Sequence, residues 1–315
     1  IVRAAAQPLV MRYIKGSLAI AHNGAITNLS ELHETLEQGG AIFQSNSNAE
    51  LIAYVVASQR VVTASIEDAV LSAVKQLKGA FSMVLSSPSK LIGVRDPNGF
   101  RPLCIGKIGE SYVLSSESCA FESLGAQFIR DVLPGEVVVI DEDGLHSYKE
   151  NCTGKSSVCM FEYVYIARPD SVIDGVSVHN ARKRAGAFLA EEYPVEADLV
   201  CGVPDSGVSA ALGYAERSGI PYGMALIKNK YIGRTFAGHR NAFKEQLVKI
   251  KINVLKAAVE GKRIVIIDDS IVKGTTCAHI VRLLREAGAK EVHMRISSPP
   301  FLNQCYYGTD IDDKN

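Results

Sequence analysis

The feature that most constrains the fold is the stretch IVIIDDSIVKGTT, which runs from Ile264 to Thr276. Four branched apolar residues lead directly into two adjacent aspartates, Asp268 and Asp269, and a short loop of mostly small residues follows. A continuous apolar run is typical of a parallel strand that is buried on both faces. Because ligands of open parallel sheets bind beyond the carboxyl ends of the strands, we predict a binding site at the two aspartates.

The chemistry of this stretch favours a phosphorylated sugar. Two adjacent carboxylates repel each other, so both stay ionised only where cations or hydroxyl donors face them, and a sugar diol with a divalent metal would supply both. Backbone N–H groups and Ser/Thr hydroxyls over 270–276 could surround a phosphate at the positive end of the next helix. The loop is not a Walker A loop, because Thr follows Gly274. An aspartate pair alone could equally well cap that helix.

Strands and helices alternate through the second half of the chain, and its strands are nearly continuous in apolar residues. Helices are expected over 178–192, 207–218 and 275–287, and strands over 197–204, 220–227, 262–268 and 291–300. This pattern predicts an α/β domain with a mainly parallel sheet covered on both faces.

The first half contains closely spaced strand candidates with turn residues between them. They lie at 16–24, 80–87, 90–96, 101–109, 111–118 and 135–144. Two helical patterns interrupt them, over 28–38, where Asn28 is a candidate N-cap, and over 48–78. This pattern predicts an α+β domain around antiparallel sheets. The polar run 149–157 predicts the boundary, with domains over 1–148 and 149–315.

Composition argues against several classes of function. Lys+Arg and Asp+Glu both number 34 among 315 residues, whereas proteins that bind nucleic acid usually have a basic excess. No apolar run approaches the ~20 residues of a membrane span. Seven widely spread cysteines, an odd number, favour a reducing compartment. We therefore expect a cytoplasmic protein with neither nucleic acid nor membrane as a partner.

Several motifs together resemble one enzyme family. VIIDDSIVKGTT resembles the phosphoribosyl pyrophosphate (PRPP) motif of type I phosphoribosyltransferases. FEYVYIARPDSVIDGVSV (161–178), GVPDSG (202–207) and KNKYIGRTF (228–236) narrow the resemblance to the glutamine PRPP amidotransferases. LAIAHNGAITN (18–28) and VRDPNGFRPL (94–103) resemble their N-terminal-nucleophile glutaminase domain. The resemblance implies an αββα glutaminase domain followed by a type I phosphoribosyltransferase domain.

The resemblance also implies a reaction and a PRPP site. Glutamine, PRPP and water would give 5-phosphoribosylamine, glutamate and pyrophosphate, the first committed step of purine biosynthesis, with ammonia passing internally between the sites. The implied ligands of Mg²⁺ are Ser206, Asp268 and Asp269. The segment 228–236 is the implied flap that closes over PRPP and excludes water. The implied PRPP-binding residues are Asp205, Ser206, Gly207, Lys228, Lys230, Arg234, Asp268, Asp269, Ser270, Lys273, Gly274, Thr275 and Thr276.

For the glutaminase site the resemblance implies that Asn23 and Gly24 form the oxyanion hole, a suitable pairing of a side-chain amide with a backbone N–H. Arg3 is expected to bind the carboxylate of glutamine, and Asn48 its ammonium. The family usually has aspartate at position 48, so Asn48 keeps a hydrogen bond and loses the charge.

The nucleophile of the family is an N-terminal cysteine whose α-amine serves as base. The sequence begins with Ile1 and has no cysteine before Cys104. We therefore expect the N-terminus to be incomplete, and we expect no glutamine hydrolysis by that route from the polypeptide as written.

Cys159 and Cys305 match positions at which some family members hold a [4Fe–4S] cluster, together with a CxxC pair near the C-terminus. Two thiolates do not hold such a cluster, so this hypothesis needs two further cysteines beyond residue 315 and an incomplete C-terminus. The alternative for this pair is that both are small buried hydrophobes. That alternative is the expectation for Cys104, Cys119, Cys152, Cys201 and Cys277.

Feedback inhibition by purine nucleotides and a homo-oligomer, a dimer or a tetramer, are further implications of the resemblance. Two other classes share the PRPP motif. A base-salvage phosphoribosyltransferase would lack the HNG and RDPNGFRPL segments. A PRPP-sensing regulator would carry a basic DNA-binding domain, which the net charge of zero argues against. The glutamine-dependent phosphoribosyltransferase is therefore the preferred hypothesis.

Overall fold

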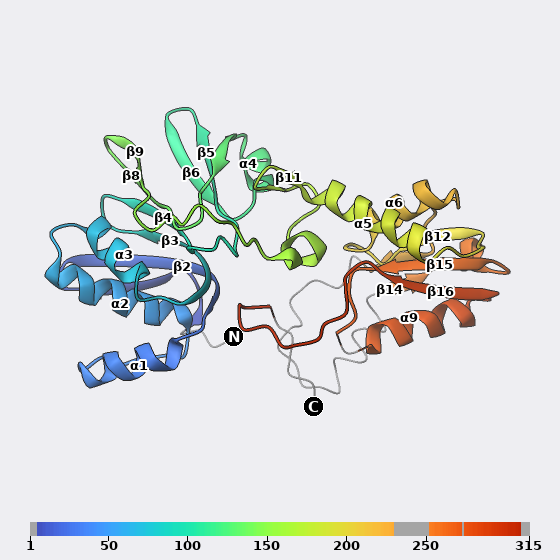
Figure 1. The fold of residues 1–315 in the computed structure, drawn as a ribbon, viewed down its shortest axis with the longest axis horizontal. Coiled ribbons are helices and arrows are strands. Elements are labelled where there is room, and N and C mark those ends of the chain that lie inside the picture. Colours follow the sequence, from blue (N-terminus) through green and yellow to red (C-terminus); the bar gives the residue numbers. More distant parts are fainter. Residues whose placement is uncertain (1–4, 230–251, 273, 310–315) are drawn as a thin grey trace. The chain divides into compact units, whose positions relative to one another are not determined.

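The computed structural model describes residues 5–229, 252–272 and 274–309, which form two compact units (Figure 1). Unit 1 comprises Ile1–Cys159, Val172–Asp174 and Gln304–Asn315, and unit 2 comprises Met160–Ser171 and Gly175–Asn303. Two short segments from the second half of the chain thus belong to unit 1. Four predicted site residues lie outside the described residues: Arg3, Lys230, Arg234 and Lys273.

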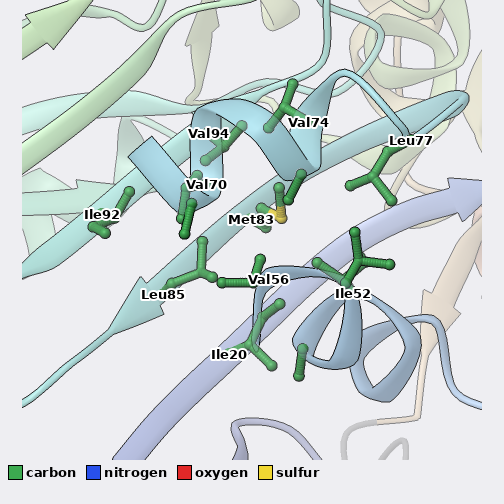
Figure 2. Close-up of a cluster of buried hydrophobic side chains, with 14 of the residues drawn as sticks. Ile20, Ile52, Val56, Val70, Val74, Leu77, Met83, Leu85, Ile92 and Val94 are labelled. Atoms are coloured by element: carbon green, nitrogen blue, oxygen red, sulfur yellow. The ribbon is translucent and has the colours of Figure 1, made fainter. Parts of the chain in front are cut away.

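Unit 1 contains a six-stranded antiparallel sheet in the order β1-β2-β3-β4-β8-β9. Its strands are β1 (Leu9–Tyr13), β2 (Gly16–Ile26), β3 (Gly79–Ser86), β4 (Leu91–Arg95), β8 (Val137–Asp141) and β9 (Gly144–Tyr148). The helices that follow β2 are α1 (Leu29–Gln38), α2 (Asn48–Val62) and α3 (Ile66–Val74). Because alternate strand residues face the same side, one face of the sheet is apolar and packs against α2 and α3. Figure 2 shows this core, which includes Ile20, Ile52, Val70, Met83 and Ile92.

A second antiparallel sheet packs on the opposite face, with the order β6-β5-β7. Its strands are β5 (Cys104–Ile108), β6 (Ser111–Ser115) and β7 (Gln127–Asp131). The sheets approach closely at Gly93, where a Cβ would lie 2.8 Å from Leu114 Cδ1. Helix α4 (Cys119–Leu124) packs on β5, since a Cβ on Gly106 would lie 2.9 Å from the Phe121 ring. The helix–sheet–sheet–helix layering confirms the predicted αββα class.

Unit 2 contains a parallel sheet in the order β12-β15-β16, formed by β12 (Leu199–Gly202), β15 (Arg263–Asp268) and β16 (Glu291–Ile296). Val265 and Ile267 of the central strand pack with helices α5 (Val178–Glu192) and α6 (Val208–Ser218). Ile264 and Ile266 pack on the other face with α9 (Thr275–Glu286). All four side chains are fully buried, which explains why this stretch of sequence is continuously apolar. The parallel pairing of β15 with β12 and β16 confirms the predicted parallel sheet.

Two of the predicted helical features differ from the structure. The helix predicted over 48–78 is two helices, because α2 ends at Val62 and Ser65 begins α3 by accepting a hydrogen bond from the Asp68 N–H. Asn28 precedes α1 but does not cap it. Its side chain accepts from the Lys78 N–H and donates to the Gln76 carbonyl, both at 3.0 Å. Partners this distant in sequence outcompete the local cap.

The strand predicted over 220–227 is also wrong. β13 (Leu226–Lys228) covers only its end and pairs antiparallel with β14 (Ile252–Val254), outside the parallel sheet. The earlier part makes only an isolated bridge to β12 at Tyr222. Pro221 has no N–H to donate, so it cannot continue a central strand.

The remaining elements are short. They are a π-helical turn over Glu162–Ile166, β10 (Val172–Ile173), β11 (Val176–Ser177) and α8 (Lys256–Val259). Strands β1, β7, β9, β10, β11 and β14 were not predicted. Within the described ranges, the helices are all too short or too polar to cross a membrane.

Candidate active sites

The first candidate site lies where β12 and β15 end side by side in unit 2. The Val203 N–H donates to the Ile267 carbonyl at 2.8 Å, so the loop after β12 stays next to β15. A Cβ on Gly207 would lie 2.3 Å from that carbonyl oxygen, and one on Gly202 would lie 2.6 Å from the Val208 Cα. Only glycine permits this approach, which brings the loop against the carboxylates that follow β15.

The two carboxylates are largely buried, with Asp268 7% and Asp269 6% exposed. The hydroxyls of Ser206 and Ser270 both donate to the Asp269 carboxylate. The Asp269 N–H donates to Asp268 Oδ1 at 2.9 Å. Burial and then the neighbouring Asp269 charge raise the pKa of Asp268 to about 6. Two buried carboxylates held by hydroxyls and an N–H are therefore set to accept further donors or a cation.

The loop that follows the carboxylates leads directly into α9. Ser297 and Ser298 donate their N–H groups to the carbonyls of Asp268 and Asp269, at 3.0 and 2.9 Å, and fix the start of the loop. Gly274 precedes the helix with a φ of 70°, and Thr275 and Thr276 are its first two residues. Gly274 has no side chain to occupy the N–H groups of the first turn, so these groups suit an anion.

Two further predicted residues of this site, Asp205 and Lys228, lie at its exposed side. Lys228, the last residue of β13, forms an ion pair with Asp205, and both side chains are more than half exposed. The Pro204–Asp205 peptide is cis. The structure therefore brings Ser206, Asp269 and Ser270 into direct contact and joins Asp205 to Lys228.

The second candidate site lies on β2 of unit 1. Gly24 has a φ of 123°, and a Cβ there would lie 2.0 Å from the Ala80 carbonyl oxygen. Gly24 is opposite Phe81, whose N–H donates to Asp96 Oδ2 at 3.2 Å and whose carbonyl accepts from the Asp96 N–H at 2.8 Å. Both backbone polar groups of Phe81 are therefore directed to Asp96 and not to Gly24. In an antiparallel pair of this kind the backbone N–H and carbonyl of the opposite residue, Gly24, also point away from the partner strand, β3.

His22 shows where the Gly24 N–H points. In a strand, residues two apart direct their N–H groups to the same side. The His22 N–H donates to Gln7 Oε1 at 2.5 Å, on the side of β1. β1 begins at Leu9, which is opposite Ile20, so the Gly24 N–H points to the sheet edge beyond β1. This N–H, beside the exposed Asn23 side chain, is placed to meet a developing negative charge.

The His22 ring has a marked environment of its own. Its Nε2 atom is buried and has no hydrogen-bond partner among the described residues. Burial, and then the positive charge of Arg101, lower the pKa of His22 to about 4. The imidazole is therefore neutral near pH 7.

Asn48 is the first residue of α2, and sequence reasoning missed the residue that fixes the loop before it. Glu50 is 3% exposed and accepts the N–H groups of Gln44 and Ser45, each at 2.7 Å, and the Ser45 hydroxyl at 2.6 Å. Ser47 caps the Glu50 N–H at 3.1 Å. Serine followed three residues later by glutamate is a capping-box pattern, so the sequence did carry this signal.

The structure also joins two of the motifs on which the family resemblance rests. Arg95 is fully buried, and its Nη1 and Nη2 donate to Asp174 at 2.7 and 2.9 Å. Its other donors reach the carbonyls of Gly99, Arg101 and Val132. Asp174 is thereby anchored in unit 1, far in sequence from Arg95.

The cysteines divide by burial. Cys104, Cys119 and Cys201 are buried, as expected for small hydrophobes. Cys152 and Cys277 are only partly buried, contrary to that expectation, and the Cys277 Sγ lies 3.8 Å from Asp268 Oδ2.

The predicted cluster ligands Cys159 and Cys305 are free, partly buried thiols of unit 1. Over the described ranges, no three His, Cys, Asp or Glu side chains group as a metal site. The cluster remains a prediction.

Comparison with known proteins defines the class. Residues 1–123 match a glutamine amidotransferase domain, and residues 177–297 match a phosphoribosyl transferase domain. Unit 1, which contains Gly24, is therefore the amidotransferase domain. Unit 2, in which Asp268 and Asp269 follow the central parallel strand, is the phosphoribosyltransferase domain.

The relatives define the family. The amidophosphoribosyltransferase of Bacillus subtilis is 48% identical over 305 residues, which cover 96% of this chain and 64% of that protein. The amidophosphoribosyltransferase of Archaeoglobus fulgidus is 46% identical over 309 residues, which cover 98% and 68%. The solved glutamine PRPP amidotransferase of B. subtilis, in complex with ADP and GMP, matches with a TM-score of 0.89 and 47% identity, over 98% of this chain and 68% of that one. The chain belongs to the amidophosphoribosyltransferase family, and it spans about two thirds of the length of these relatives.

Proposed function

We propose that the protein is an amidophosphoribosyltransferase that converts glutamine, PRPP and water to 5-phosphoribosylamine, glutamate and pyrophosphate. This would be the first committed step of purine biosynthesis. One observation carries the proposal: Ser206 of the loop after β12 donates to Asp269 after β15, so two separate PRPP motifs meet at one point. The proposed domains are a glutaminase over 1–148 and a phosphoribosyltransferase over 149–315.

The proposed PRPP site assigns one part of the ligand to each segment. The carboxylates of Asp268 and Asp269 accept the ribose hydroxyls, because both are buried and Asp269 already accepts hydrogen bonds from two hydroxyls. Backbone N–H groups of the loop over 202–207 approach the pyrophosphate, since Gly202 and Gly207 at its two ends carry no side chain. The loop over 270–276 and the start of α9 take the 5′-phosphate.

The two carboxylates and the Ser206 hydroxyl also fit Mg²⁺, because they are oxygen ligands and the buried negative charges need a cation. When bound, Mg²⁺ would neutralise the charge of the pyrophosphate leaving group. Lys228, Lys230 and Arg234 belong to the proposed flap that excludes water from the ribose during the displacement. Lys273 is proposed as a further PRPP ligand.

In the proposed glutaminase site, Asn23 and the Gly24 N–H stabilise the tetrahedral intermediate of amide hydrolysis. The support is that Gly24 directs its N–H out of the β2–β3 ladder. Arg3 and Asn48 bind the carboxylate and the ammonium of glutamine, and the ammonia that is released passes internally to the ribose. Glu50 holds the loop that leads into Asn48.

Further parts of the proposal rest on the family alone. Purine nucleotides would act as feedback inhibitors, in line with the ADP and GMP bound to the B. subtilis relative. Cys159 and Cys305 would ligate a [4Fe–4S] cluster with two further cysteines. The protein would be a cytoplasmic homo-oligomer, with neither nucleic acid nor membrane as a partner.

The test is to measure PRPP-dependent formation of phosphoribosylamine by the full-length protein, with glutamine and with ammonia as nitrogen donors. The double variant Asp268→Asn/Asp269→Asn should lose PRPP binding in calorimetry and lose both activities while remaining folded. Asp198→Asn, at the opposite end of the parallel sheet, is the matched control and should bind PRPP normally. Unchanged PRPP affinity in a folded double variant would refute the assignment of the ribose site.

A further inference from the structure

A segment near the C-terminal end of the described chain packs next to the candidate oxyanion hole. The described residues 304–309 belong to unit 1, although they follow the last strand of unit 2 in sequence. The Tyr307 ring stacks on Phe100, with ring centres 4.7 Å apart and an interplanar angle of 28°. The Tyr307 carbonyl accepts a hydrogen bond from Arg101 Nη2 at 2.9 Å, and Arg101 is 2% exposed. Tyr307 is therefore anchored by both its ring and its backbone.

This anchor places Gly308 directly against Gly24. Gly308 has a φ of 91°, and a Cβ there would lie 2.8 Å from the carbonyl carbon of Gly24 and 3.1 Å from its Cα. A Cβ on Gly24 would in turn lie 2.0 Å from the Ala80 carbonyl oxygen on β3. The backbone of Gly24 is thus confined between Ala80 and Gly308, and neither contact leaves room for a side chain.

A donor that stabilises an oxyanion must already be in place before the charge develops. The Gly24 N–H lies in the part of β2 beyond the start of β1, so β1 does not pair with it. The contact with Gly308 supplies a restraint at that position. Arg101, which donates to the carbonyl of the neighbouring Tyr307, is also close enough to His22 for its charge to lower the His22 pKa.

We propose that Gly308, held by the Tyr307 anchor, is a positioning residue for the Gly24 oxyanion donor. Gly308 acts through Gly24 and touches no reacting atom, and the proposal rests on the proposed glutaminase function. It predicts a defect confined to glutamine hydrolysis, because displacing Gly24 weakens stabilisation of the transition state more than it weakens binding of glutamine.

The test compares Gly308→Ala with Gly40→Ala in the full-length protein. Gly40 has nearly the same φ, 90°, but a Cβ there would meet nothing within 4 Å, so it matches the backbone strain without the contact. Gly308→Ala should lower the glutamine-dependent kcat by a factor on the order of 10², the effect of losing one oxyanion donor. Its KM for glutamine and its ammonia-dependent rate should stay within about threefold of wild type. Gly40→Ala should retain both rates.

A second variant covers the case in which Gly308→Ala does not fold. Tyr307→Leu removes the ring stack on Phe100 and leaves Gly308 itself unchanged, so its glutamine-dependent kcat should fall about two- to tenfold at an unchanged ammonia-dependent rate. Equal kcat values for Gly308→Ala and Gly40→Ala, or for Tyr307→Leu and wild type, would overturn the inference. So would a rise in KM alone. A wild-type protein that forms no phosphoribosylamine from PRPP with either glutamine or ammonia would instead refute the proposed function.

Discussion

Replacing Asp174 with asparagine removes one negative charge from a partly buried ion pair and leaves the shape of the side chain almost unchanged. Asp174 accepts two hydrogen bonds from Arg95, and the side chains are 27% and 1% exposed. The φ of Asp174 is 47°, in the left-handed region that asparagine also tolerates, so backbone strain is not altered. The substitution therefore isolates the charge, and it turns one acceptor oxygen into an NH₂ group that faces guanidinium donors.

The size of the effect follows from the surroundings of the pair. Removing one partner of a fully buried pair typically costs about 3–5 kcal/mol. After the substitution Arg95 still donates hydrogen bonds to three backbone carbonyls, which limits the loss of folding free energy. Burial, and then the charge of Asp174, raise the pKa of Asp131 to about 6, so the substitution also relieves a repulsion. We therefore expect unit 1 to lose about 2–3 kcal/mol of stability.

Native-state hydrogen exchange of the β4 and β8 amides measures the opening free energy of unit 1 separately from unit 2. The matched control is Glu110→Gln, which breaks the ion pair of Glu110 with Lys107 at 3.2 Å. Glu110 is almost fully exposed, so this change should cost less than about 1 kcal/mol. If Asp174→Asn cost no more than the control, the desolvation of Arg95 would cancel its pairing with Asp174, and the reasoning would be wrong.

Two further predictions concern packing and pH. Gly186→Ala should destabilise unit 2 by about 1–3 kcal/mol in urea unfolding, because its Cβ would lie 1.8 Å from the Ala210 carbonyl oxygen where α5 crosses α6. The control variant Asn180→Ala, on the exposed side of α5, should change the stability of unit 2 little. The His22 pKa is about 4 in the folded protein and 6.5 ordinarily, so its contribution is fully present above pH 6.5 and is lost as the pH falls to about 4, by at most about 3 kcal/mol. His22→Gln should flatten the acid dependence of stability in that window, and an unchanged slope would contradict the burial of a neutral imidazole.

The sequence was most informative where a local pattern has one physical cause. The apolar run before Asp268 reflects a central strand buried on both faces, and α5 begins and ends at the predicted residues 178 and 192. The carboxyl end of a parallel strand is a binding position by topology, so Asp268 and Asp269 could be singled out without coordinates. The family itself followed from long motifs, and the comparisons confirm it.

The sequence was least informative where distant residues compete with local preferences. Asn28 looks like a helix cap, yet its side chain bonds to residues 76 and 78. The pattern over 48–78 stays helical in composition, and the break between α2 and α3 depends on the Ser65 cap. Strands β7 and β9 are short, and part of β7 is exposed, so their apolar content is too low to stand out.

By itself, the sequence determined the two fold classes, the family, and the residue types next to the strand-end carboxylates Asp268 and Asp269, because those depend on local patterns and on motifs that are contiguous in the chain. Only the tertiary structure decided which motifs touch. It joins Ser206 to Asp269, Arg95 to Asp174, and Gly308 to Gly24, pairs that are separated by 63, 79 and 284 positions. Contacts at such separations are set by how the layers pack, and no local preference of the chain encodes them.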